Sequence, residues 1–127
     1  MIVVDTSALI EVLFDAPLAE ACMAVLESEE DAAVSAGTLT EALIVAGRRG
    51  VARPMDRLVR GLGVEVVPVT EAMARRVSGA YARWGKGAHP AALNFGDCFA
   101  YALAEERACG LLFVGGDFSR TDVASCL

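Results

Sequence analysis

The chain has 127 residues and a formal net charge of −6, so it is long enough for one domain with its own core and too acidic for a general nucleic-acid binder. Hydrophobic residues make up 55% of it and aromatic residues only 6%, so Ala, Val and Leu must supply most of the core. No apolar run reaches the roughly 18 uncharged residues of a membrane helix, and no signal-peptide pattern opens the sequence. We therefore expect a cytoplasmic protein without a membrane anchor, and its four isolated cysteines argue against a zinc site or a disulfide framework.

The elements expected in the first half alternate between strand and helix. Apolar runs at 1–4 and 32–35 predict two short buried strands. The spacing of apolar residues predicts a helix capped by Thr6 or Ser7, a second helix over 17–27 with Pro17 in its first turn, and a third that ends near Gly47 or Gly50. The inward positions of the second helix are expected to include Ala21.

The second half continues the alternation. We expect a helix over 51–62 ended by Gly63, a strand over 64–67, a helix capped by Thr70, a helix that begins at Asn94, and a last strand over 111–114. Strands that alternate with helices imply right-handed crossovers and a parallel sheet with helices on both faces. The fold class is therefore α/β, a short parallel sheet of four or five strands flanked by helices, in a single domain over residues 1–127.

Four acids stand where open α/β sheets place their ligands, at the carboxyl ends of strands and on the helices that follow. Asp5 and Asp117 follow apolar strands, whereas Glu41 and Asp97 lie in helices. Each helix acid also has an ordinary explanation. Asp97 can be the N3 acid of a helix capped by Asn94, and Thr38-x-x-Glu41 has the spacing of a capping box.

Charge is unevenly distributed along the chain. Residues 1–47 contain no Lys or Arg, whereas residues 48–86 contain nine of the eleven basic residues. This asymmetry permits an acidic centre with a basic rim, which suits a metal site that also holds a polyanion. Arg53, Arg57 and Arg60 recur at helical spacing and are weak candidates for RNA contacts, the alternative being a solvated helix face.

Carboxylates are the chemistry that the residue inventory allows. His89 is the only histidine and is expected to be exposed and incidental, and no phosphate-binding glycine motif is present. Two like charges about 4 Å apart repel by roughly 4 kcal/mol at an effective dielectric of about 20, so clustered carboxylates need a cation among them. Oxygen ligands select Mg²⁺ or Mn²⁺, which can activate a water for in-line attack on a phosphodiester.

The ordered motifs resemble those of the PIN-domain ribonucleases, and most of all the VapC-type toxins of bacterial toxin–antitoxin pairs. The likeness spans the chain and rests on four segments: Val3-Val4-Asp5-Thr6-Ser7-Ala8-Leu9, Thr38-Leu39-Thr40-Glu41, Leu93-Asn94-Phe95-Gly96-Asp97 with the residues up to Ala104, and Phe113-Val114-Gly115-Gly116-Asp117-Phe118 with the residues up to Val123. The last motif has Gly116 where the family usually carries a polar residue.

The resemblance implies an endoribonuclease that depends on Mg²⁺ or Mn²⁺ and cleaves structured RNA such as transfer or ribosomal RNA. It implies a catalytic set of Asp5, Glu41, Asp97 and Asp117, with Asp5, Asp97 and Asp117 as metal ligands. Thr6 or Ser7 would support Asp5, and Asp122 would be a further acid behind the ligands. It also implies a homodimer that is silenced by a cognate antitoxin.

Two other functions stay open from the residues alone. Haloacid-dehalogenase-like phosphohydrolases also begin with a strand-end Asp and end with Gly-Asp-like acids, but they carry a second Asp where this chain has Ser7. A PIN-like binding module without turnover would be expected to lack one or more of the acids, and all four are present.

Overall fold

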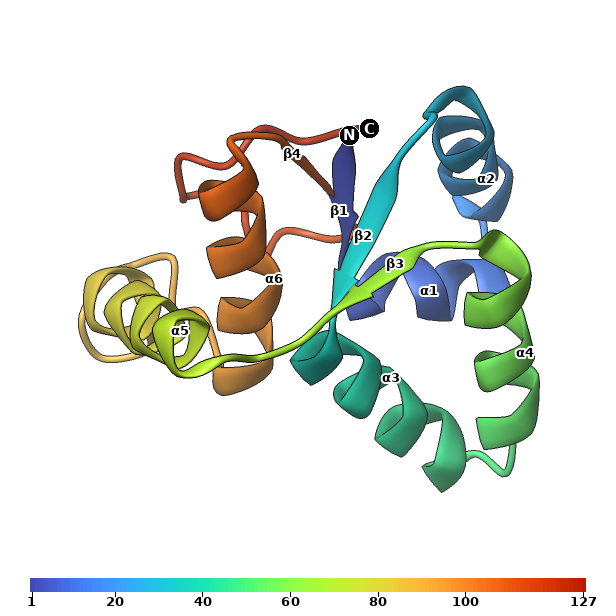
Figure 1. The fold of residues 1–127 in the computed structure, drawn as a ribbon, viewed down its shortest axis with the longest axis horizontal. Coiled ribbons are helices and arrows are strands. Elements are labelled where there is room, and N and C mark those ends of the chain that lie inside the picture. Colours follow the sequence, from blue (N-terminus) through green and yellow to red (C-terminus); the bar gives the residue numbers. More distant parts are fainter.

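Four short parallel strands and six helices make up the computed structural model, which describes residues 1–127 (Figure 1). The elements in chain order are β1 (Ile2–Val4), α1 (Thr6–Leu13), α2 (Ala19–Ser28), β2 (Ala32–Ser35), α3 (Ala36–Arg48), α4 (Ala52–Leu62), β3 (Glu65–Val67), α5 (Glu71–Trp84), α6 (Phe95–Arg107) and β4 (Gly110–Leu112). The expected α/β class with a flanked parallel sheet is confirmed.

The sheet has the order β3-β2-β1-β4, so β1 lies between β2 and β4. The chain builds β2 and β3 on one side of β1 and then crosses through α5 and α6 to place β4 on the other side. The order therefore reverses at the carboxyl end of β1, which is where open α/β sheets form ligand sites. Asp5 is the residue that follows this strand.

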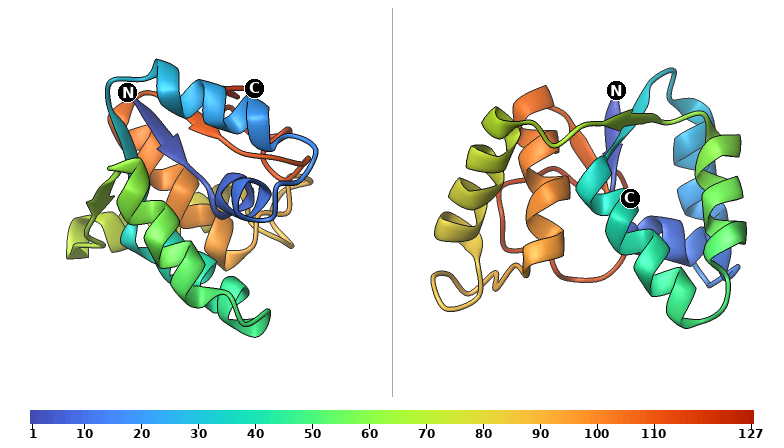
Figure 2. Two further views of the ribbon diagram at one scale, coloured as in Figure 1. Left: turned by 90° about the vertical axis from the view of Figure 1, so that its right-hand side faces the viewer. Right: turned by 60° about the horizontal axis from the view of Figure 1, so that its bottom comes forward.

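Two apolar cores cover the two faces of the sheet. Val3 packs with residues of α5 and α6, whereas Ile2 and Val4 pack with residues of α1, α2, α3 and α4. This division follows from the alternation of side chains along a strand, since every residue of β1 is buried on one face or the other. The right-hand view of Figure 2 shows α5 and α6 on one side of the sheet and α1, α2 and α4 on the other.

The observed helix ends confirm two of the predicted caps and correct the predicted starts of α1 and α2. Gly63 ends α4 in the left-handed conformation with φ of 66°, and the Thr70 side chain caps α5, both as expected. The first helix is capped by Asp5, not by Thr6 or Ser7. α2 begins at Ala19 and leaves Pro17 outside, because the turn after α1 extends through Leu18, and Ala21 is exposed rather than inward.

His89 is not exposed, contrary to expectation. Its ring packs edge-on against Trp84 with 4.7 Å between centroids, and its Nδ1 accepts a hydrogen bond from the Ala91 N–H at 3.0 Å. It therefore fixes the loop between α5 and α6. The structure contains no helix that is both long and apolar enough to cross a membrane.

Candidate active site

Asp5 is held by Ser7 at the reversal point of the sheet. Its Oδ2 accepts hydrogen bonds from the Ser7 N–H at 3.0 Å and from the Ser7 hydroxyl at 2.6 Å. The Ser7 Oγ in turn accepts from the Val114 N–H at 3.0 Å, which links the start of α1 to the segment after β4. The other oxygen, Oδ1, is buried without any partner. A buried carboxylate oxygen without a hydrogen-bond donor is unfavourable unless it binds a cation or a proton.

Asp97 occupies the N3 position of α6. The Asn94 side chain accepts from the Asp97 N–H at 2.8 Å, and Oδ2 of Asp97 accepts from the Asn94 N–H at 3.0 Å. This is a complete capping box, so the helix-capping explanation of Asp97 is confirmed. Only one of its carboxylate oxygens is used in that bond, and the side chain is buried beside the other acids. The capping role and a role in the site are therefore compatible.

Glu41 is positioned by Thr6 rather than by its own helix. The Thr6 hydroxyl donates to Oε1 of Glu41 at 2.7 Å, across 35 residues of sequence. The alternative explanation of Glu41, a capping box with Thr38, is wrong, because α3 begins earlier, with Ser35 as its N-cap. Thr6 therefore supports Glu41, and Ser7 alone of the two predicted supports holds Asp5 with its side chain.

Electrostatics place the four acids in one neighbourhood. The pKa of Asp97 is raised to about 6, first by burial and then by the charges of Asp5, Asp117 and Glu41, against a hydrogen bond from the Asn94 N–H that lowers it. Burial likewise raises the pKa of Asp5, and the charge of Glu41 adds to that rise. The carboxyls of Asp5 and Asp97 are thus harder to ionise, first because of burial and then because of acidic neighbours. Shifts of this kind are typical of a functional site.

The two acids after β4 lie in different settings. Asp117 is exposed in the loop that follows the strand, and its charge acts on Asp97. Asp122 instead accepts a hydrogen bond from the Tyr101 hydroxyl at 2.6 Å and pairs with Arg83 at 3.4 Å. It is not among the charges that shift the pKa of Asp97. The charges of Asp5, Glu41 and Asp117 thus all act on Asp97, whereas Asp122 is held by Tyr101 of α6 and Arg83 of α5.

The donor set suits a hard divalent cation such as Mg²⁺ or Mn²⁺. It consists of oxygen atoms, carries a concentrated negative charge, and includes the unpartnered Oδ1 of Asp5. No three or more Asp, Glu, His or Cys side chains are gathered closely enough to form a preassembled metal site. Thr6 holds one oxygen of Glu41, and the Asn94 N–H holds one oxygen of Asp97.

Gly96 is a site residue to which the sequence reasoning gave no role. A Cβ at this position would collide with the carboxylate of Glu41 where it now lies, so the glycine allows that carboxylate to rest against the first turn of α6. The available signal was a residue of low helix propensity placed immediately before Asp97. The close approach itself comes from the packing of α3 on α6.

Replacing Gly96 with Ala should displace the Glu41 carboxylate and reduce catalysis. We expect the rate of RNA cleavage to fall by about tenfold or more, because misplacement of a catalytic group by about 1 Å costs that much or more. The melting temperature should change little, because the atoms displaced are the carboxylate atoms at the end of the flexible Glu41 side chain. Gly79→Ala is the matched control, because a Cβ there meets no atom within 4 Å. Equal activity of Gly96→Ala and wild type would show that Glu41 can move without consequence.

The raised pKa of Asp97 makes the stability of the metal-free protein depend on pH. The pKa of Asp97 in the folded protein is about 6, above the ordinary 3.8. The contribution of this carboxyl to the free energy of unfolding is therefore fully present below pH 3.8 and is lost as the pH rises through 6. Asp97→Asn removes this loss. In EDTA, the variant should become more stable than wild type between about pH 4 and about pH 7, by on the order of 1–3 kcal/mol. Thermal denaturation across this range measures the difference, and parallel curves would contradict it.

Comparison with known proteins gives a consistent relationship. The family model described as PIN domain matches residues 2–124. Ribonuclease VapC30 of Mycobacterium tuberculosis is 40% identical over 126 residues, which cover 97% of this chain and 96% of the relative. Among solved structures, Mycobacterium tuberculosis VapC20, described as a Sarcin-Ricin loop cleaving toxin, superposes with a TM-score of 0.78 at 18% identity and covers 98% of this chain and 97% of its own.

A second solved structure carries a partner protein. The toxin–antitoxin complex from Klebsiella pneumoniae superposes with a TM-score of 0.70 at 19% identity and covers 96% of this chain and 93% of that one. At these identities the two structures support the fold alone, whereas the family match and the 40% relative span almost the whole chain. The chain therefore belongs to the PIN-domain family, among its VapC proteins.

Proposed function

We propose that this protein is the toxin of a toxin–antitoxin pair, an endoribonuclease that hydrolyses phosphodiester bonds of structured RNA and depends on Mg²⁺ or Mn²⁺. The observation that carries the proposal is that the Glu41 carboxylate lies against Gly96, the residue before Asp97, and that the charges of Asp5, Glu41 and Asp117 all act on the Asp97 carboxyl. The name of the 40% identical relative supports the same activity. Because the chain belongs to the PIN-domain family, we do not propose the haloacid-dehalogenase-like phosphohydrolase function.

Asp5, Asp97 and Asp117 are the residues that would hold the cation. When bound, a divalent cation supplies an activated water and offsets the charge that develops on the phosphodiester. Ser7 fixes Oδ2 of Asp5, and the buried Oδ1 has no hydrogen-bond partner and would be available to the cation. Thr6 fixes Oε1 of Glu41, so that the second oxygen of Glu41 can accept the proton of the attacking water.

Cleavage of total bacterial RNA by the purified protein tests the proposal. Discrete fragments should form with Mn²⁺ or Mg²⁺ and should disappear in EDTA. The fragment ends would then identify the substrate, for which transfer and ribosomal RNA are the proposed classes. Fragments that persist in EDTA would refute a metal-dependent site. Binding of RNA without fragments in either metal would favour a non-catalytic binding module instead.

A cognate antitoxin and a second copy of the chain are the proposed protein partners. The toxin–antitoxin complex that shares this fold supports the first. Exposed apolar side chains on and near β3 and α5, among them Val66 and Tyr81, support the second, because such residues are more often covered in assemblies. Both partners would act where the RNA is, in the cytoplasm.

The arginines of α4 are proposed as weak RNA contacts. Arg53, Arg57 and Arg60 are exposed, and only Arg60 is paired, with Asp56 at 3.0 Å. Replacing all three with Gln should weaken RNA binding and lower the slope of log K against log salt by about 2, since each lost phosphate contact on a single strand removes about 0.7. Filter binding at several salt concentrations measures the slope. The control variant Arg75→Gln, Arg76→Gln on α5 should have the wild-type slope. An unaltered slope in the α4 variant would mean that Arg53, Arg57 and Arg60 contact solvent and not RNA.

A further inference from the structure

A groove of about 300 Å³ runs between α3 and the first turn of α6, next to the acid cluster. This volume is at the lower end of the range of small-ligand sites, about 300–1,000 Å³. Ile44 and Val45 of α3 form one wall, and Phe95 and Phe99 of α6 form the other. Glu41, already placed in the candidate active site, also lines the groove. The groove and the acid cluster are therefore continuous.

Phe95 presents an aromatic ring to solvent at this groove. Its side chain is 72% exposed, although burying an aromatic side chain is normally favourable by about 1.5–3 kcal/mol. The ring contacts Phe99 edge-on, with 4.9 Å between centroids and an interplanar angle of 90°. Phe99 is itself fixed against Gly37, where no Cβ would fit. Phe95 is therefore held by Phe99 while most of its side chain is exposed to solvent, two residues before Asp97.

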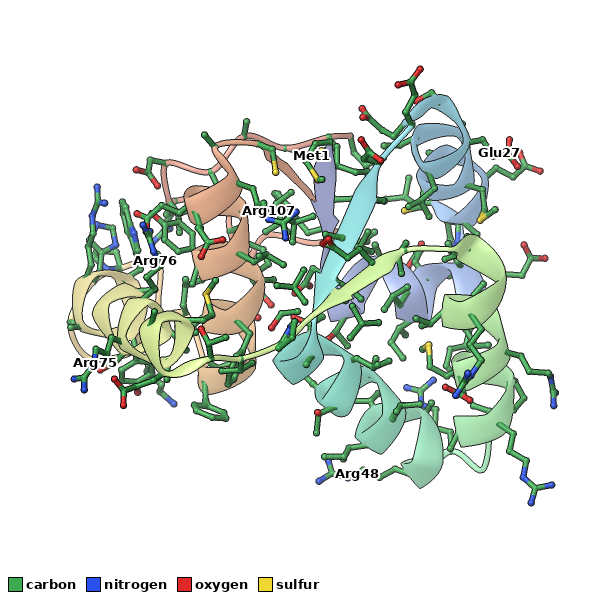
Figure 3. The ribbon with its side chains drawn as sticks, in the orientation of Figure 1. Met1, Glu27, Arg48, Arg75, Arg76 and Arg107 are labelled. Atoms are coloured by element: carbon green, nitrogen blue, oxygen red, sulfur yellow. The ribbon has the colours of Figure 1, made fainter.

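Opposite charges line the groove together with its apolar walls. Arg48 lies on α3 two turns beyond Glu41, about 10 Å along the helix axis, and takes part in no ion pair. Figure 3 shows its side chain at the end of α3, directed to the side on which α6 lies. The groove thus combines an acid shared with the active site, an aromatic face and a free cation.

A second cavity on the other side of Phe95 has a different character. It has about 420 Å³ and lies between α5 and α6, with Val69, Val77 and Tyr81 among its lining residues. No charged residue lines it. A cavity lined by apolar residues and one serine suits a protein surface, whereas the α3/α6 groove offers the aromatic face and the cation that bind a nucleotide.

We propose that the α3/α6 groove receives an unpaired base of the RNA, next to the phosphodiester that is cleaved. The base stacks on Phe95 beside Ile44, and Arg48 binds the following phosphate. This inference rests on the proposed function and extends it to a specificity subsite. Aromatic side chains that stack splayed bases are the usual means by which proteins read single-stranded positions of structured RNA. A phosphate bound at the acid cluster leaves its neighbouring base within reach of a groove that shares Glu41 with that cluster.

Stacking is tested first by binding, independently of cleavage. The probe is a single-stranded RNA of about ten nucleotides that carries 2-aminopurine, titrated in Ca²⁺. Wild type and Phe95→Trp should quench its fluorescence, and Phe95→Ala should bind about tenfold more weakly or worse without quenching. Phe14→Ala, which removes another exposed aromatic ring outside the groove, should behave as wild type. Equal binding and quenching by wild type and Phe95→Ala would overturn the proposal.

Cleavage kinetics test the subsite on the mapped RNA. Phe95→Ala should raise KM by about tenfold or more with little change in kcat, and Phe95→Trp should restore KM. An abasic nucleotide at one position beside the cut should raise KM for wild type by a similar factor and have no further effect on Phe95→Ala, because both changes remove one contact. If the Phe95→Ala substitution and the abasic nucleotide raise KM by independent factors at every position of the RNA, no base contacts Phe95 and the proposal is refuted.

Two further outcomes separate this proposal from others. If wild type cleaves no RNA, the proposed function fails, and the 2-aminopurine titration alone decides the groove. If Phe95→Ala and Tyr81→Ala both halve the mass measured by light scattering, while intact and abasic RNA are cleaved with equal KM, a second copy of the chain covers this face. That result would overturn the base-binding groove.

Discussion

Asp97→Asn should abolish metal-dependent RNA cleavage and leave the fold intact. The amide removes the negative charge that Asp97 contributes to the acid cluster, and we expect the rate to fall by about a thousandfold or more, as for other residues that act within a catalytic unit. The amide oxygen can still accept the hydrogen bond from the Asn94 N–H, and the Asn94 side chain can still accept from residue 97. The cap of α6 is therefore retained.

Initial rates on a defined RNA in Mn²⁺ measure this effect, with circular dichroism to verify the fold. Asp56→Asn is the matched control, because Asp56 is an acid on α4 whose partner is Arg60. It should cleave as wild type does. Full activity of Asp97→Asn would show that Asp97 is not needed for cleavage and that its raised pKa does not mark a catalytic site.

The Asp5→Ala, Asp97→Ala double variant should lose Mn²⁺ binding altogether. Asp5 offers the buried Oδ1 that has no partner, and Asp97 is the acid on which the charges of the other three act. Without these two groups, Asp117 and Glu41 remain on separate segments, and one of them is exposed in a loop. Two carboxylates so placed make a weak site for a hard cation, which takes six or more oxygen ligands.

Isothermal titration calorimetry with Mn²⁺ measures the loss. The Asp56→Ala, Glu71→Ala double variant removes the same charge from α4 and α5 and should bind Mn²⁺ as wild type does. The replacements also remove the cap that Asp5 gives α1 and the Asp97 half of the capping box of α6, so circular dichroism must verify that the metal-free double variant is folded. An unchanged binding isotherm would exclude Asp5 and Asp97 as ligands.

Local patterns were sufficient to predict the parts of the fold that local physics determines. β2 was expected at 32–35 and is observed at Ala32–Ser35, and the capping of α6 by Asn94 with Asp97 at N3 is confirmed. Strands of three or four apolar residues followed by an acid also predicted which residues lie at the carboxyl edge of the sheet. Their meeting at β1 follows from the strand order, which right-handed crossovers restrict but do not determine.

Contacts between distant segments could not be predicted from spacing. Glu41 had a suitable local partner in Thr38, but the structure gives it Thr6, because α1 and α3 start at the same edge of the sheet. Asp122 follows Asp117 by five residues and was predicted to support the same site. Its hydrogen bond to Tyr101 depends on how the chain after β4 returns over α6. The role of Asp122 in metal support stays a prediction.

Asp5 shows why one residue can satisfy several patterns at once. It ends a strand, caps a helix and carries the carboxylate of the site. The sequence suggested the first and third of these roles and assigned the cap to Thr6 or Ser7. Capping by Asp5 was missed because Ser and Thr are equally good caps one and two residues later. Their hydroxyl groups instead hold the two acids Glu41 and Asp5.

The central claim is that four carboxylates from separate segments act as one site, and a parallel cleavage assay tests it most directly. Wild type and the single variants Asp5→Asn, Glu41→Gln, Asp97→Asn and Asp117→Asn are incubated with the same RNA in Mn²⁺, and the initial rates are compared. We expect discrete cleavage by wild type and a severe loss of rate in each of the four variants, with the fold retained. Wild-type rates in Asp5→Asn or Asp97→Asn would contradict the central claim.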